Sequence, residues 1–304
     1  MTRMVALGGA LWMGLVVVTA VPAAAEAPAT PQYTLRYVFH PGETLRWEVL
    51  HRSSVRTTIS GTTQVAETLS TSVKAWQVTK VAADGTATFE HRVEDIDMRQ
   101  DLTGRPPVHY NSRTDKSPPN GFENLAEAVG VTLAVVTMDN RGKILERSRT
   151  QVKAGAKSEA QMTIPLPEKP LTVGESWSFP YDQVVTSDKM FKKIKILQKF
   201  TLEDVKNGVA TIRVENDVLT PVQDPAVEAQ LIECGAGGTV QLDIDAGRIL
   251  RQQTDLDKRV VGFRGEASSI HYLTRFTEKF RGATAEVAQH AGGEEKASRP
   301  REIR

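Results

Sequence analysis

The chain has 304 residues, which is enough to bury a substantial core in two domains or in one large β domain. Its 38 Lys and Arg residues almost balance its 37 Asp and Glu residues, and such a near-neutral chain lacks the basic footprint of a nucleic-acid-binding protein. Its single cysteine, Cys234, excludes an internal disulfide, so packing and backbone hydrogen bonds have to hold the fold.

The first residues have the three-part layout of a secretory signal. After a short basic start, an apolar run extends from Val5 to Val21 and is followed by small residues up to Ala25. This layout predicts a signal peptide over residues 1–25, cleaved near Ala25 or alternatively after Ala27, and hence a periplasmic or secreted protein. An uncleaved membrane anchor is disfavoured because the run is short for a span and contains glycines. No later apolar stretch is long enough to cross a bilayer, so we expect no transmembrane segment in the mature chain.

Residues 31–163 are expected to form a first β-rich repeat. Apolar alternation over residues 69–75 is typical of a strand, and Asp84-Gly85 is typical of a hairpin turn because glycine adopts positive φ without strain. A helix is predicted over residues 120–131, where apolar residues recur at helical spacing after a Pro and Gly break. Residues 139–142 predict a further tight turn between strands.

The remaining chain is predicted to hold a linker, a second repeat and a tail. Residues 164–170 contain three prolines, which predict a stiff, extended linker. Residues 171–281 are expected to form a second β-rich repeat, with a hairpin turn at Asn207-Gly208 and a helix that begins after Asp224. Residues 282–304 lack apolar periodicity and are expected to be disordered.

Three short sequence phrases occur twice in the same order, which indicates an internal duplication. Each phrase is one that strands and their turns would produce. The pairs are Gly42–Trp47 with Gly174–Phe179, Trp76–Phe89 with Phe200–Ile212, and Met138–Leu145 with Ile244–Leu250. We therefore expect a mainly β (α+β) fold with two related halves, each a curved antiparallel sheet that carries one helix, joined either as two domains or as one shared sheet.

No motif in the sequence predicts a catalytic or metal site, and no cofactor is expected. The segment Gly174–Ser178 differs by one residue from a nucleophile elbow, but its counterpart in the first half lacks the motif, so a strand entry is favoured. The segment Asp243–Gly247 resembles the start of a calcium loop without the glutamate that completes one, so a hairpin turn is favoured. Cys234 has no histidine near it in sequence, and we interpret it as a small buried residue.

One strand predicted over residues 191–202 is strongly two-sided. Its apolar residues share one face, and Lys193, Lys195 and Lys199 share the other. These lysines are the only candidate ligand-binding residues of the sequence, because a basic strand face attracts anionic headgroups or polysaccharide. The alternative is a solvated face that discourages edge pairing.

The phrase from Leu166 to Trp177 resembles openings seen in uncharacterised secreted bacterial proteins. Long alternating strands, a helix and the turn from Asp245 to Arg248 are also similar to periplasmic lipoprotein-carrier folds, over roughly residues 33–281. That resemblance implies a curved antiparallel sheet that covers helices and an apolar cavity, and it transfers no site residue.

The leading functional hypothesis is an exported, non-catalytic binding protein, in which the concave face of a sheet holds an apolar or amphiphilic ligand. A lipid or another envelope component is the expected partner, and nucleic acid is not. The alternative is a cell-envelope scaffold or protein-interaction module that works through loops or edge strands. An enzyme is the third hypothesis, with residues too scattered in the sequence to be seen.

Overall fold

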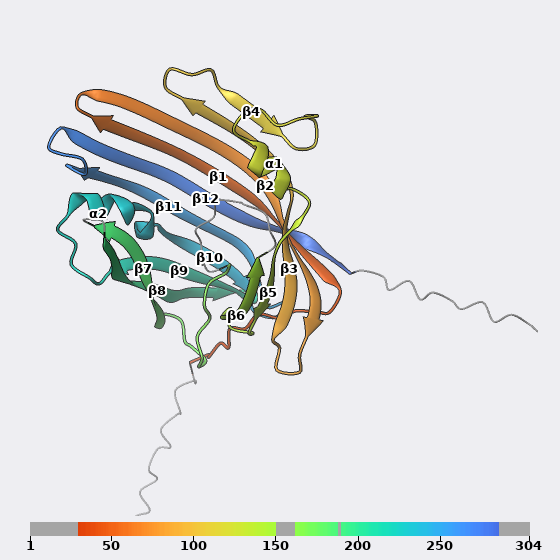
Figure 1. Ribbon diagram of the computed structural model, residues 1–304. Coiled ribbons are helices and arrows are strands. Elements are labelled where there is room, and N and C mark those ends of the chain that lie inside the picture. The colour runs from red at the N-terminus through yellow and green to blue at the C-terminus, as the bar shows by residue number, and fades with distance from the viewer. Residues whose placement is uncertain (1–29, 150–161, 188–189, 286–304) are drawn as a thin grey trace, which may run out of the picture. The chain divides into compact units, whose positions relative to one another are not determined.

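The computed structural model describes residues 30–149, 162–187 and 190–285. Most of these residues belong to one antiparallel sheet, which confirms the prediction of a mainly β fold (Figure 1). The strands are β1 (Glu43–Ile59), β2 (Thr62–Val81), β3 (Ala87–Leu102), β4 (Val108–Asn111), β5 (Thr132–Met138), β6 (Ile144–Arg149), β7 (Ser176–Ser187), β8 (Met190–Lys206), β9 (Val209–Val218), β10 (Gly237–Asp243), β11 (Arg248–Val261) and β12 (Ser268–Ala285). Two short α-helices, α1 (Glu123–Ala128) and α2 (Pro225–Gln230), and the 3-10 helix η1 (Ile232–Gly235) complete the described elements.

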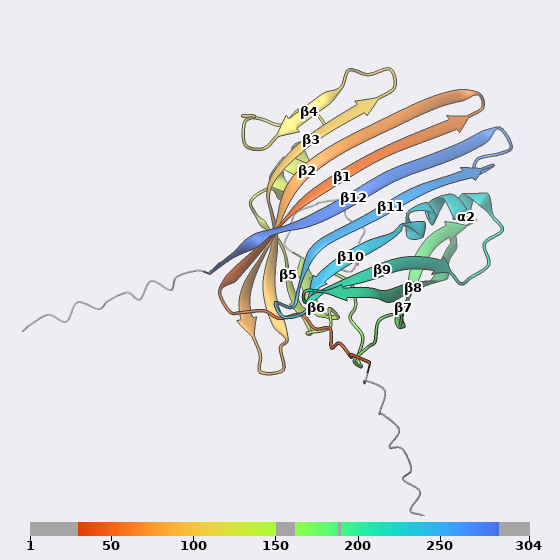
Figure 2. The same ribbon diagram turned by 180° about the vertical axis from the view of Figure 1, so that it is seen from behind.

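The strands lie in the order β6-β5-β3-β2-β1-β12-β11-β10-β9-β8-β7, with β4 paired to β3. Most neighbours in the sheet are also neighbours in the chain. The exceptions are the pair β3 and β5, since β4 lies between them in the chain, and the pair at the centre, where the last described strand, β12, pairs with the first, β1. The pairing of β1 with β12 joins the N-terminal strands to the C-terminal strands in one continuous sheet (Figure 2).

The predicted hairpin turns are confirmed. Asp84-Gly85 connects β2 to β3, and Asn207-Gly208 connects β8 to β9. Asn207 and Gly208 have φ values of 50° and 77°, which is the double left-handed conformation that a two-residue hairpin with matching twist requires. Residues 139–142 likewise turn β5 into β6.

The main hydrophobic core contains side chains from both wings of the sheet. Phe89 of β3 and Phe200 of β8 are fully buried in the same cluster, although many strands separate them in the sheet order. The inner side of the sheet therefore wraps around a shared core. The prediction of two related halves is not confirmed, because both parts of the chain contribute strands to one sheet and side chains to one core. That the two parts arose by duplication stays a prediction.

The proline-rich segment 164–170 is part of this core. Ile164 and Leu166 are buried, and the Leu166 backbone N–H donates to the carbonyl of Arg141 at 2.8 Å. Arg36 donates from its guanidinium to the carbonyls of Pro167 and Glu168. Segment 164–170 is thus held by packing and hydrogen bonds on the inner side of the sheet.

The helices lie where the sequence predicts them, but α1 is shorter than residues 120–131. Gly121 and Gly130 both have positive φ, so the helix is confined between them. The predicted cap of α2 is confirmed, because the Asp224 carboxylate accepts from the Ala226 backbone N–H at 2.8 Å. Among the described residues, no helix is long and apolar enough to cross a membrane.

Replacing Asp224 with Ala is expected to lower the free energy of unfolding by about 1 kcal/mol, because it removes the helix cap. Urea unfolding would measure the change. Asp204→Ala, on an exposed strand position beside Lys206, is the matched control and is expected to change stability by less than about 0.5 kcal/mol. Equal losses in both variants would contradict a capping role.

Two predicted regions fall wholly or mostly outside the described residues. The signal peptide, residues 1–25, lies outside them entirely. Of the predicted tail, residues 282–285 form the end of β12, and the rest lies outside the described residues.

Candidate functional site

The face of the sheet that carries the core is here called the inner face. Directly opposed residues of antiparallel strands point to the same side. Buried Trp47 of β1 lies opposite Phe280 of β12 and Lys74 of β2, so these three side chains define the inner face at the core. Every second residue away from Trp47 continues this face along the strand.

Beyond the core, the inner face of the central strands carries large apolar side chains that are only partly buried. We call these side chains the inner apolar stripe. They are Val55 and Ile59 of β1 with Ile270, Tyr272 and Phe276 of β12. Next to the stripe, Leu256 and Val260 of β11 are buried on the same face. Apolar side chains of β1, β12 and β11 therefore lie next to one another on this face, with Thr57, Thr274 and Lys258 interspersed among them.

The neighbouring strand β2 gives this surface a hydroxyl-rich border. Thr68, Ser70 and Ser72 lie opposite Ser53, His51 and Val49 of β1, which places them on the inner face. No large apolar side chain interrupts this run. The inner face therefore carries more large apolar side chains over β12 and β11, and it is rich in hydrogen-bonding groups over β2.

The two α-helices cover the inner face on either side of the central strands (Figures 1 and 2). Phe122, the N-cap residue of α1, is buried in one cluster with Ile96 of β3, and Val227 of α2 is buried in one cluster with Ile194 and Ile196 of β8. Among the described elements, β1 makes its main contacts with β2 and β12 only. The apolar stripe thus lies between the two α-helices, and neither of these helices packs directly on it.

Helix α2 and η1 also make polar contacts to the edge of the stripe. The Tyr272 hydroxyl donates to the Glu233 carboxylate at 2.7 Å, and Lys258 lies 3.2 Å from the Glu228 carboxylate. Burial raises the pKa of Tyr272, and the hydrogen bond to Glu233 adds to the shift, so Tyr272 keeps its proton and remains a donor. These contacts hold α2 and η1 in place beside the stripe.

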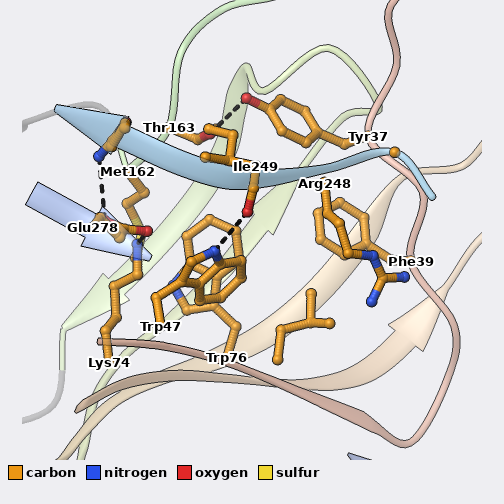
Figure 3. A pocket seen from close by; sticks show the side chains of 13 residues that line it. Tyr37, Phe39, Trp47, Lys74, Trp76, Met162, Thr163, Arg248, Ile249 and Glu278 are labelled. Atoms are coloured by element: carbon orange, nitrogen blue, oxygen red, sulfur yellow. Dashed lines mark hydrogen bonds and ion pairs between the residues drawn. The ribbon is translucent and has the colours of Figure 1, made fainter. Parts of the chain in front are cut away.

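At the foot of the stripe, where it meets the core, lies a buried ion pair (Figure 3). Lys74 Nζ is 2.5 Å from Glu278 Oε1, and Gln252 donates to the other carboxylate oxygen at 3.2 Å. The Lys74 ammonium also lies 4.7 and 4.8 Å from the ring centroids of Trp47 and Trp76. Only 14% of the Lys74 side chain and 5% of the Glu278 side chain are exposed.

The cavity beside this ion pair is small. It is lined by aromatic residues, Met162 and the Lys74–Glu278 pair, and its volume is about 10 Å³ (Figure 3). That volume is about the space of one water molecule. This cavity is therefore too small for an organic ligand.

His91 is a largely buried histidine, a residue type that often transfers protons in enzymes. Its surroundings, however, disfavour such a role at neutral pH. Burial is the main reason that the pKa of His91 is lowered to about 4, and the positive charges of Lys74 and Arg147 add to the shift. The imidazole is therefore neutral at physiological pH. In the described part of the chain, no group of three or more His, Cys, Asp or Glu side chains is placed so that it could hold a metal ion.

The sequence-predicted lysines are not part of the inner face. Lys193, Lys195 and Lys199 are exposed on the outer side of β8, while Ile194 and Ile196 between them are buried. The two-sided strand prediction is confirmed, but these lysines lie on the other side of the sheet from the apolar stripe. The stripe itself was partly visible in the sequence, as the alternation of Ile270, Tyr272 and Phe276. The Lys74–Glu278 pair was not, because 204 residues separate its members.

The other motifs have structural places. Ser176 begins β7 and its hydroxyl is 2.8 Å from that of Thr201, as expected for a strand entry. The Asp243 carboxylate accepts from the backbone N–H of Ala246 in the turn before β11. Cys234 is partly buried beside the α2 cluster, and burial raises its pKa, so it remains a protonated thiol at neutral pH.

A second hollow lies on the outer side of the sheet and is polar. Its volume is about 290 Å³, and it is lined mainly by residues of β1, β2 and β3, including Arg46, Arg92 and Glu94. Arg46 donates to both carboxylate oxygens of Glu94, and Arg92 pairs with Glu90. The arginine charges are thus already neutralised by protein carboxylates.

No protein-family model and no curated protein matches this chain. Among solved structures, one of lipovitellin that concerns its lipid–protein interactions matches with a TM-score of 0.44 and 11% sequence identity, over 82% of this chain and 26% of that chain. DynF from the dynemicin biosynthesis pathway of Micromonospora chersina matches with a TM-score of 0.20 and 8% identity, over 86% of this chain and 92% of that chain. This chain therefore spans about a quarter of the lipovitellin chain, and the likenesses are too weak to assign a function. The resemblance to secreted bacterial proteins and to lipoprotein-carrier folds stays a prediction.

Proposed function

We propose that this protein is an exported, non-catalytic binding protein that holds an amphiphilic ligand against the inner face of its sheet. The observation that carries the proposal is the inner apolar stripe: Val55, Ile59, Ile270, Tyr272 and Phe276 are partly exposed side by side between two helical walls. Large apolar side chains gathered on one open surface are a cost to a protein in water unless something covers them.

The distribution of polar groups supports an amphiphile rather than a purely apolar ligand. An apolar chain lying along β12 contacts the stripe, while the hydroxyls of Thr68, Ser70 and Ser72 on β2 are two strands away across β1. A ligand with one apolar edge and one hydrogen-bonding edge satisfies both surfaces. A hydrocarbon without polar groups would leave the hydroxyl border without partners.

Replacing Ile270 with Glu is expected to weaken ligand binding at least tenfold, because the ligand would have to desolvate a carboxylate on the stripe. Titration of the protein with a fluorescent fatty acid measures the effect. Leu273→Glu is the matched control: Leu273 lies on the same strand, is 47% exposed and points to the outer side opposite Ser54.

The expected result is tight binding by the wild type and by Leu273→Glu, and weak binding by Ile270→Glu. Wild-type protein that binds no amphiphile, or equal loss in both variants, would contradict the proposal. Native mass spectrometry of protein purified without detergent gives a second readout, since a bound amphiphile adds a discrete mass.

The export part of the proposal is supported by the signal layout of residues 1–25. Mass spectrometry of the protein isolated from its host is expected to give an N-terminus at Glu26. An intact Met1 would contradict cleavage.

A further inference from the structure

The free end of the β7–β8 hairpin carries an exposed apolar group away from the inner apolar stripe. Val184, Met190 and Phe191 are 51%, 61% and 81% exposed. Single exposed apolar residues are common on protein surfaces, but Phe191 is the most exposed large apolar side chain among the described residues, and Met190, the residue before it, is exposed and apolar too. The hairpin end therefore presents large apolar side chains to the solvent.

Lysines flank the exposed apolar group. Lys193 lies directly opposite Val184, and Lys195 follows on the same outer side of β8. The acidic residue opposite Lys195 is Asp182, whose carboxylate lies 3.9 Å from Lys193 while both side chains remain largely exposed. Among the described residues on this face, one carboxylate lies between two lysines, so the described part of the hairpin end carries net positive charge there.

Further along the same strand, the charge is balanced. Lys199 lies opposite Glu215 of β9, and six residues of strand place it roughly 20 Å from Lys193. The basic face predicted from the sequence is thus not uniform. Its positive character is concentrated at the end that carries Met190 and Phe191.

The hairpin end is braced by α2. The Gln230 side chain accepts from the Thr186 backbone N–H at 2.9 Å and donates to the Thr186 carbonyl at 2.8 Å. Val185 and Ile194 are buried beneath, in a cluster with Val227 of α2. Helix α2, which forms one wall of the inner face, therefore also fixes the orientation of the hairpin end.

We propose that the end of the β7–β8 hairpin docks on the surface of an anionic lipid bilayer. Met190 and Phe191 enter the boundary between headgroups and acyl chains, and Lys193 and Lys195 contact the anionic headgroups. A lipid surface fits this combination better than a second copy of the chain, because lysines beside the edge strand β7 oppose pairing with another edge of like charge. This docking surface stands independently of the ligand-binding proposal.

Sedimentation of the full chain with vesicles tests the proposal. One vesicle set is pure phosphatidylcholine, and the other contains phosphatidylglycerol. The wild type is expected to bind the anionic vesicles and to lose most of that binding in high salt. Phe191→Asp and the double variant Lys193→Gln/Lys195→Gln are each expected to reduce binding at least tenfold.

Two control variants have to keep the wild-type affinity. Lys199→Gln removes a lysine from the same strand face where the charge is balanced, and Leu145→Asp changes an apolar residue that is 54% exposed on another strand. Every variant shares the same N-terminal apolar run, so any binding by that run cancels in the comparison. The fatty acid titration, done without vesicles, is expected to be unchanged in Phe191→Asp, which separates failure of docking from failure of ligand binding.

Three results would overturn the proposal. They are anionic-vesicle binding that Phe191→Asp does not reduce, equal binding to both vesicle sets, and a wild-type dimer in light scattering that Phe191→Asp converts to a monomer. The dimer result would assign the hairpin end to a second copy of the chain.

Discussion

Replacing Glu278 with Gln is expected to lower the free energy of unfolding by about 3–5 kcal/mol, because it leaves a buried cation without its counterion. Lys74 is only 14% exposed and its ammonium lies against the rings of both Trp47 and Trp76, so water reaches it poorly. The ring contacts are worth about 0.5–2 kcal/mol and cannot replace a carboxylate. Lys74→Met is expected to have a similar effect, since it leaves the Glu278 carboxylate buried with only Gln252 as a neutral donor.

The double variant Lys74→Met/Glu278→Leu is expected to recover much of that loss, because an apolar pair of similar volume removes both desolvation costs. Urea unfolding of the four proteins forms a double-mutant cycle. Asp255→Asn is the control, since it breaks an exposed ion pair with Arg275 and is expected to cost less than about 1 kcal/mol. A Glu278→Gln protein as stable as the Asp255→Asn protein would show that water reaches the pair.

Lowering the pH from 7 to 4 is expected to cost the wild type roughly 3 kcal/mol through His91 alone, at about 1.4 kcal/mol per pKa unit. Burial, with Lys74 and Arg147, lowers the pKa of His91 from 6.5 to about 4 in the folded protein. The unfolded chain therefore binds the proton first as the pH falls. The stability present above pH 6.5 is lost progressively as the pH drops toward 4.

Urea midpoints at pH 7, 5.5 and 4 measure this dependence. His91→Leu is expected to flatten the slope between pH 6.5 and 4 relative to the wild type, whereas carboxylate titration below that window remains in both proteins. His271→Gln is the control, because His271 is partly exposed beside Asp257 and its removal is expected to leave the His91 slope in place. A wild-type slope that survives in His91→Leu would contradict a buried neutral histidine.

Local features of the fold were predictable because short segments determine them. The turns at Asp84-Gly85 and Asn207-Gly208 need only a glycine that accepts positive φ between alternating strands, and the cap at Asp224 needs only one carboxylate before a helix. The two faces of β8 follow from alternation alone. Each of these features involves residues within a few positions of one another.

Long-range features were not predictable from one sequence. Nothing in the local pattern says that the strand at 268–285 pairs with the strand at 43–59, because each is equally able to pair with any antiparallel neighbour. The proline-rich segment 164–170 reads as a linker because composition does not report burial, yet Ile164 and Leu166 lie in the core. The apolar stripe exists only because β1 pairs with β12 in one register. The alternation of its β12 residues can be read from the sequence, but the β1 residues that lie beside them cannot.

The position of β12 has a consequence for how the chain is made. Its strand partner β1 is complete before residue 60, but β12 begins at Ser268 and is the last of the described strands to emerge from the ribosome. Until then, β1 and β11 each present a bare edge that any passing strand is able to join. A stop codon before β12 would therefore yield one truncated chain in which the β1 and β11 edges both stay open and prone to aggregation, and the intact chain is expected to fold slowly because the pairing of β1 with β12 joins strands far apart in the sequence.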